Sequence, residues 1–365
     1  MKRSHHKGMD FIRFRSFRYI SIFLATLAFL SSGCGIIKHV APIPRLLKTE
    51  DASQATLMNE VNRFARVNSM RAKMYLKFED NSFAAFGSKE VYRSADGEVV
   101  VQRPGKIFLK VQLPVIHSDV AQMTSDGKTF RVAVLQDNAS GKYKKFVKGS
   151  NDADYSKLQK SLNSADLESA KLTKESVSAF SNMRPQHFTD AMLVRPTAAS
   201  DAYSLSSIFQ VEEDPNEPVK SRLRSVMRGY YLLDEFARHP DGGLQIQRRF
   251  WFDRVGGIRL ARQQIFDIKG EIESDIIYGK EGKLTGSDDY ANLPLEIQVT
   301  RPKEKYSMKL TYQTPEAVEI GETYKDSAFL LKNTWGLEEV DLDEKLREAN
   351  AEMPSKESKT MIVHY

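Results

Sequence analysis

The 365-residue sequence has only one cysteine, Cys34, and this scarcity excludes a whole means of stabilisation. One thiol cannot form a disulfide within the chain, so any fold must depend on its packed core. Common enzyme signatures are also missing: no HExxH, paired CxxC, GxSxG or Walker phosphate loop occurs. His117 and Asp119 come nearest to a catalytic fragment, but loop residues reach this spacing by chance. We therefore expect no enzyme, no catalytic residue and no metal site.

Long apolar runs are scarce as well. The N-terminal run Tyr19–Leu30 has twelve residues, whereas a helix needs about twenty to cross a bilayer. It follows a stretch with six Lys or Arg and one acid, Asp10, and it precedes the small residues Ser31–Gly33. A basic region, a short apolar run and small residues before a cut are typical of a secretory signal. The sequence therefore predicts a signal peptide over residues 1–33.

The residue after this predicted cut is Cys34, and its place indicates a lipoprotein. The segment resembles the bacterial lipobox, Leu-(Ala/Ser)-(Gly/Ala)-Cys, except that Leu30 stands one position early and Ser31 takes its place. The resemblance implies a covalent lipid on Cys34, palmitate included, and no other cofactor. Asp after the cysteine favours the inner membrane in similar lipoproteins, so Gly35 predicts the periplasmic face of the outer membrane. An uncleaved anchor or an ordinary signal peptide with an incidental cysteine is the alternative.

The excess of positive charge is confined to the signal. The whole chain has a net charge of +6, and residues 1–33 account for +5 of it through six Lys or Arg and one Asp. About +1 is left for the mature chain, too little for the basic surface that nucleic-acid binding needs. We therefore expect a membrane partner through the lipid anchor and no nucleic acid.

Beyond the signal, changes in hydrophobic period divide the chain. Residues 34–50 are predicted to be a tether, and residues 51–68 a helix capped by Asp51. From Met70 onward apolar residues alternate with polar ones, with hairpin turns expected at Asp96-Gly97 and Asp126-Gly127. The pattern predicts an α+β domain over 51–315 with about eleven antiparallel strands, interrupted by a helical insertion at about 150–200. Residues 316–365 are interpreted as a charged C-terminal extension, with one exposed helix followed by disorder.

Two stretches resemble the LolA/LolB family, the carriers and receptors that move lipoproteins across the bacterial periplasm. The first is Arg103-Pro104 after a strand, with Pro114 eleven positions beyond the arginine; the second is the turn Ser125–Thr129 before an aromatic strand. The resemblance implies an unclosed antiparallel barrel whose helices cover an apolar cavity for acyl chains, with Arg103 controlling the lid. The chain departs from the family where Ile107 and Leu109 replace aromatic residues.

A set of inward-pointing apolar residues on the predicted strands forms the candidate cavity wall. The leading hypothesis is a membrane-anchored receptor or carrier that binds lipid or lipoprotein acyl chains, with a periplasmic carrier protein as a further partner. The alternatives are a filled core in place of a cavity, and a non-enzymatic envelope scaffold or stress sensor that uses the same fold to bind proteins. The predicted lipid-binding residues are Met74, Leu76, Phe78, Ile107, Leu109, Phe130 and Val132.

Overall fold

The computed structural model describes residues 43–80, 90–114, 117–136, 144–155, 158, 184–285 and 287–351. The predicted signal, Cys34 and most of the predicted 150–200 insertion lie outside the described residues. The chain divides into two compact units. The described part of the smaller unit is residues 43–45 and Glu213–Ser225, and that of the larger lies within 46–212 and 226–351.

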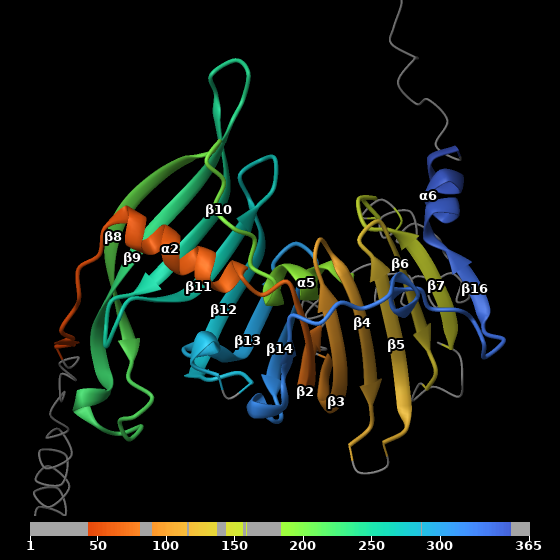
Figure 1. The fold of residues 1–365 in the computed structure, drawn as a ribbon, viewed down its shortest axis with the longest axis horizontal. Helices are drawn as coiled ribbons and strands as arrows, with labels where there is room; N and C mark the ends of the chain where they lie inside the picture. Colours follow the sequence, from red (N-terminus) through yellow and green to blue (C-terminus); the bar gives the residue numbers. More distant parts are fainter. Residues whose placement is uncertain are drawn as a thin grey trace, which may run out of the picture. The chain divides into compact units, whose positions relative to one another are not determined.

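The fold is dominated by one sheet of sixteen strands (Figure 1). The main path runs β9-β10-β11-β12-β13-β14-β2-β3-β4-β5-β6-β7-β16, with β8 on β9 and β15 on β2. The strands are β1 (Arg45–Leu46), β2 (Ser69–Asp80), β3 (Glu90–Gln102), β4 (Lys106–Gln112), β5 (Asp119–Asp126), β6 (Thr129–Val134), β7 (Lys145–Ser150), β8 (Ala202–Glu213), β9 (Ser225–Arg238), β10 (Leu244–Asp253), β11 (Arg259–Phe266), β12 (Ile272–Gly282), β13 (Leu293–Arg301), β14 (Tyr306–Tyr312), β15 (Glu319–Ile320) and β16 (Glu338–Asp341).

Alternation of side chains gives the sheet one dry face. Met70, Ala72 and Met74 on β2 are buried, whereas the intervening Arg71 and Lys73 are exposed, as the pleat requires. β14 pairs with β2 in a register that sets Leu310 opposite Leu76 and Tyr312 opposite Met74. The apolar residues of neighbouring strands therefore reach the same inner face and form one continuous core.

Three α-helices are described. They are α2 (Gln54–Ala65), α5 (Gln186–Met192) and α6 (Leu342–Ala351). Figure 1 shows α2 lying across the strands of the β9–β12 part of the sheet, and α2 contacts β11 while α5 contacts β3, β4 and β13. Short 3-10 turns occur at Arg222–Arg224, Asp288–Tyr290, Pro315–Ala317 and Asp326–Phe329.

The predicted cap of the first helix is wrong by two residues. Ser53 is the N-cap, and its hydroxyl accepts a hydrogen bond from the Thr56 backbone amide at 3.2 Å. Asp51 instead accepts from Arg254 at 2.6 Å and from the Tyr231 hydroxyl at 3.0 Å. Arg254, directly after the end of β10, therefore binds this carboxylate in place of the helix terminus.

The predicted hairpin at Asp96-Gly97 is also wrong. β3 continues through both residues as one strand of thirteen residues paired with β2 and β4. A Cβ on Gly97 would lie 2.6 Å from Cδ1 of Leu76, so the glycine gives room for a neighbouring side chain in the sheet. The turn expected at Asp126-Gly127 is confirmed, because Gly127 adopts φ +97° and Asp126 accepts from the amides of Lys128 and Thr129.

Residues from the predicted C-terminal extension take part in the fold. β16 pairs with β7 in parallel, whereas the strands of the main path from β9 to β7 pair antiparallel. Leu342 at the start of α6 is fully buried. Asp343 accepts hydrogen bonds from the Ser150 hydroxyl at 2.7 Å and from the Tyr155 hydroxyl. Side chain and backbone contacts therefore fix this segment on the β7 edge.

The predicted fold class, an unclosed antiparallel sheet with helices over one face, is confirmed, with more strands than the eleven expected. Within the described residues, no helix is long and apolar enough to cross a membrane.

Candidate functional site

The candidate site is the inner face of the sheet, where α2 and α5 cover apolar strand residues. Leu57, Val61 and Phe64 lie on one side of α2 and are buried, as expected for helical spacing of three and four. The Phe64 ring packs on Tyr278 of β12 with ring centroids 5.7 Å apart. Helix α2 therefore contacts the sheet through apolar side chains that pack on apolar strand residues.

A small apolar pocket lies beneath this cover. It has room for about 20 Å³, roughly one water molecule. Its lining joins the end of α2, the end of α5 and strands β12 to β14, and consists of Phe64, Val67, Met70, Ala191, Met192, Val194, Tyr278, Leu284, Leu293, Pro294, Ile297 and Tyr312.

Five of the seven predicted lipid-binding residues belong to the same buried cluster, beyond the pocket lining. Leu76 and Phe78 pack on the cluster while still partly exposed. The fully buried members are Met74, Ile107, Leu109, Phe130 and Val132. In the described conformation they fill the core, and contact with a lipid stays a prediction.

Arg103, the predicted gating residue, holds the cover in place through backbone carbonyls. Its guanidinium donates to Ala65 O at 3.3 Å, Val67 O at 3.2 Å, Leu193 O at 3.4 Å and Val194 O at 2.7 Å. The first two carbonyls lie at and just beyond the end of α2, where a helix leaves carbonyls unpaired. Burial, together with the nearby Arg195 and Arg248, lowers the Arg103 pKa.

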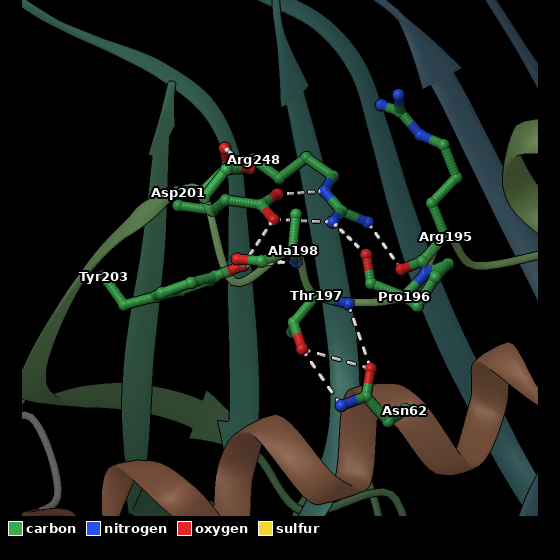
Figure 2. A network of polar contacts seen from close by, with 10 residues as sticks. Asn62, Arg195, Pro196, Thr197, Ala198, Asp201, Tyr203 and Arg248 are labelled. Carbon is green, nitrogen blue, oxygen red and sulfur yellow. Dashed lines mark hydrogen bonds and ion pairs between the residues drawn. The ribbon is translucent and has the colours of Figure 1, made fainter. Parts of the chain in front are cut away.

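A second arginine holds the next two residues. Arg248 on β10 donates to Arg195 O at 2.7 Å and to Pro196 O at 2.9 Å. Residues 193–198, which we call the strap, therefore have four consecutive carbonyls bound by two guanidiniums. Figure 2 shows the Arg248 half of this arrangement above α2.

Arg248 is neutralised within the core by Glu235 of β9. Its guanidinium donates to both carboxylate oxygens, and both side chains are almost fully buried. The Tyr203 hydroxyl lies 2.8 Å from Glu235 Oε1 and accepts from the Ala198 amide at 2.9 Å. The ion pair therefore contacts the strap in two places. Arg248 binds the carbonyls of residues 195 and 196, and Glu235 is connected through Tyr203 to Ala198 (Figure 2).

Other polar contacts join α2 to the strap and to the loop before β13. Asn62 of α2 exchanges hydrogen bonds with Thr197, 3.0 Å to the hydroxyl and 3.0 Å from the backbone amide. Arg63 donates to Ala291 O at 2.8 Å and to Asn292 O at 3.2 Å. The cover, by which we mean α2, α5 and the strap, thus presents apolar side chains to the sheet. Side-chain hydrogen bonds hold its edges in place.

His187 on α5 is a buried histidine with a structural partner. Its Nδ1 hydrogen-bonds the Tyr306 hydroxyl of β14, and the two rings lie 5.9 Å apart. Burial lowers the His187 pKa well below its ordinary value, helped by Arg301 and Arg184. The imidazole is therefore held neutral.

The His117–Asp119 pair is not assembled as a site. His117 is exposed and lies 3.9 Å from Asp96, whereas Asp119 accepts from the amide side chains of Gln112 and Gln122. Among the described residues, no three His, Cys, Asp or Glu side chains gather in a group that could hold a metal ion.

Arg248 was not among the predicted site residues, although the sequence around it carries a signal. Arg248 stands two and four residues before Phe250 and Phe252, which places a charge on an otherwise apolar strand face. That position alone indicates a buried partner, since a lone buried charge is costly. The partner, Glu235, becomes visible only through the β9–β10 register, which sets the two residues opposite each other.

No protein-family model and no curated protein matches the chain. The chain is similar in fold to the solved structure of a LolA superfamily protein from Nitrosomonas europaea, at 9% identity and a TM-score of 0.38, covering 77% of this chain and 99% of that one. It is also similar to a DUF1329 family protein from Desulfovibrio piger, at 12% identity and a TM-score of 0.36, covering 77% and 98%.

Proposed function

We propose that this protein is a non-enzymatic lipoprotein of the bacterial envelope that binds acyl chains between its sheet and its helical cover. The observation that supports this most directly is the fastening of the cover. Arg103 and Arg248 bind strap carbonyls by hydrogen bonds alone, so the cover can part from the sheet without breaking a strand pairing.

Apolar contacts in the closed form can be exchanged for lipid in an open form. An acyl chain that replaced Leu57, Val61 and Phe64 against the sheet would gain about 0.8 kcal/mol for each buried methylene. Met70 and Met192 line the small pocket, and methionine adapts its shape to irregular guests. The described conformation is then the closed state of the carrier.

The remaining parts of the proposal concern place and partners. Lipid attachment at Cys34 and the residue Gly35 after it would hold the protein at the periplasmic face of the outer membrane. There it would receive or deliver lipid or lipoprotein acyl chains, exchanging them with a periplasmic carrier protein. The Arg-Pro and Asp-Gly motifs, through their resemblance to the LolA/LolB family, support this role.

The test uses a soluble form that lacks residues 1–33 and carries Cys34→Ala. Native mass spectrometry after purification without detergent is expected to show bound lipid, and a fluorescent fatty acid should be taken up on addition. Arg103→Lys, which cannot reach four carbonyls, should change the rate of uptake. Arg249→Lys is the matched control, because Arg249 pairs with Asp234 on the other side of β10. Neither bound lipid nor uptake in any form would refute acyl-chain binding.

A second candidate function is an envelope scaffold or stress sensor. β8 pairs only with β9 among the described strands, and it exposes Leu205, Phe209 and Val211 at alternate positions. An exposed strand edge with apolar side chains favours pairing with another chain. Reproducible co-purification of one envelope protein, lost on Phe209→Lys and combined with an absence of lipid, would favour this function.

A further inference from the structure

The smaller unit has an exposed apolar tip bordered by cations. Its described part is the chain at 43–45 and the loop Glu213–Ser225 between β8 and β9. Within it Ile43 is 90% exposed, Val219 82% and Leu223 55%. This short segment therefore exposes three large apolar side chains to solvent, and none of them belongs to the buried core.

In the same unit the acidic side chains have partners, whereas two basic side chains have no ion pair among the described contacts. Its acids are engaged locally: Glu213 pairs with Arg224 at 2.9 Å, and Asp214 pairs with Arg45 at 3.4 Å. Glu217 accepts from the Ser221 hydroxyl at 3.0 Å. The exposed side chains of Lys220 and Arg222 have no ion pair among the described contacts, so the positive charge beside the apolar residues is left for an outside partner.

The Arg45–Asp214 contact also fixes where this loop lies along the chain. It ties the loop to a point eleven residues after Cys34, and Ile43 stands nine residues after it. Nine residues span at most about 32 Å when fully extended. An anchor at Cys34, whether lipid or uncleaved segment, therefore keeps this unit close to the bilayer surface.

We propose that Ile43, Val219 and Leu223, with Lys220 and Arg222, form a membrane-docking surface for anionic phospholipid. The apolar side chains enter the boundary between headgroups and acyl chains, and the two cations bind headgroup phosphates. The surface would set the orientation of this unit on the membrane, which a lipid on a tether does not do. This inference rests on the anchoring part of the proposed function and is independent of acyl-chain binding.

The test uses the full chain reconstituted into vesicles of phosphatidylethanolamine and phosphatidylglycerol. A benzophenone amino acid replaces Val219 in one preparation and Ile268 in another. Ile268, in the turn between β11 and β12, is 87% exposed and serves as the matched control. After irradiation, mass spectrometry should find phospholipid adducts at position 219 in several-fold excess over position 268.

Charge reversal supplies the second arm. Lys220→Glu with Arg222→Glu should lower the adduct yield at position 219, since each cation near an anionic surface contributes a factor of roughly five to binding. Lys269→Glu, a change in the same turn as Ile268, should leave the yield at position 219 unchanged. Vesicles of phosphatidylcholine alone should reproduce the effect of the double reversal.

Vesicle flotation is measured first and separates the two ways of failing. A chain that does not float lacks the anchor, which would overturn this inference together with the anchoring part of the proposed function. A chain that floats but labels positions 219 and 268 equally overturns the docking surface alone. Loss of acyl-chain uptake in the soluble form would leave the adduct result unaffected.

Discussion

At the scale of single residues, the closed cover depends on charges placed where apolar side chains would be expected. Arg248 and Glu235 are buried opposite each other on β10 and β9. Desolvation of the two ions offsets much of their attraction, so such a pair contributes more to defining one arrangement than to stability. Here the arrangement that it defines is the path of the strap.

Arg248→Met is expected to lower the free energy of unfolding by about 3–5 kcal/mol, because Glu235 is left charged and buried. The double variant Arg248→Met/Glu235→Leu should lose less than Arg248→Met alone, since no unpaired charge remains. Urea denaturation followed by circular dichroism measures both. A double variant that loses the sum of the single effects would contradict this account.

His187 makes stability depend on pH. Its folded-state pKa lies well below its ordinary value because of burial, so below about pH 6.5 the unfolded chain binds a proton that the folded chain does not. Stability contributed by the neutral imidazole is therefore complete above about pH 6.5 and declines as pH falls from there towards the folded-state pKa.

The expected slope for His187 is up to about 1.4 kcal/mol per pH unit. Urea denaturation between pH 7.5 and 5 should show it in the native chain. His187→Gln, which retains a hydrogen-bonding group for the Tyr306 hydroxyl, should reduce the slope. The exposed His239 provides the control, and His239→Gln should leave the slope as it is. An unchanged slope in His187→Gln would show that other groups carry the pH dependence.

At the scale of elements, side-chain alternation predicted most strands correctly, whereas their ends depended on contacts that sequence does not show. The two-residue period of Met70 to Phe78 identifies β2, and Asp126-Gly127 identifies the turn that follows β5. Asp96-Gly97 has the same local signature as a turn, yet Leu76 on the neighbouring strand makes it part of β3. Local sequence cannot distinguish these cases, because the deciding atom belongs to Leu76, twenty-one positions before Gly97.

The parallel strand β16 covers the edge of β7, and its removal is expected to promote self-association. A chain that ends after Asn333 loses the β7 pairing and the buried Leu342 side chain, the latter worth about 1.5–3 kcal/mol. It also exposes backbone donors and acceptors beside Phe146 and Val147, a template for pairing between molecules.

Light scattering and thermal unfolding measure the effect of this truncation. The matched control ends after Ala351 and retains β16 and α6. It should remain monodisperse, with a Tm close to that of the full chain. If both truncated chains behave alike, β16 is not what protects the β7 edge.

At the scale of the larger unit, α2 and the strap are expected to move as one cover. Asn62 and Thr197 contact each other at the centre of this cover, so a disulfide between Asn62→Cys and Thr197→Cys should prevent the two parts from separating. Cys34→Ala is included to remove the native thiol. Because α2 and the strap are expected to lift together, acyl-chain uptake should be the same in the oxidised and the reduced protein.

Two results distinguish the possible motions in this experiment. Uptake that slows at least tenfold on oxidation and recovers on reduction would show instead that α2 and the strap must separate. The single variant Asn62→Cys in the same background controls for loss of the hydrogen bonds, and it should respond to neither oxidation nor reduction.

The fastening of the strap has a consequence for the curvature of the sheet. Arg103 follows β3 and Arg248 lies on β10, six strands apart in the sheet, a separation of roughly 29 Å if those strands were flat. Yet their guanidiniums bind the neighbouring carbonyls of Val194 and Arg195. The strap therefore connects two distant strands of a curved sheet. A change in the curvature of the sheet changes the distance between Arg103 and Arg248, and with it their hydrogen bonds to the strap. A guest that wedges the strands apart would loosen the cover from below, without touching either arginine.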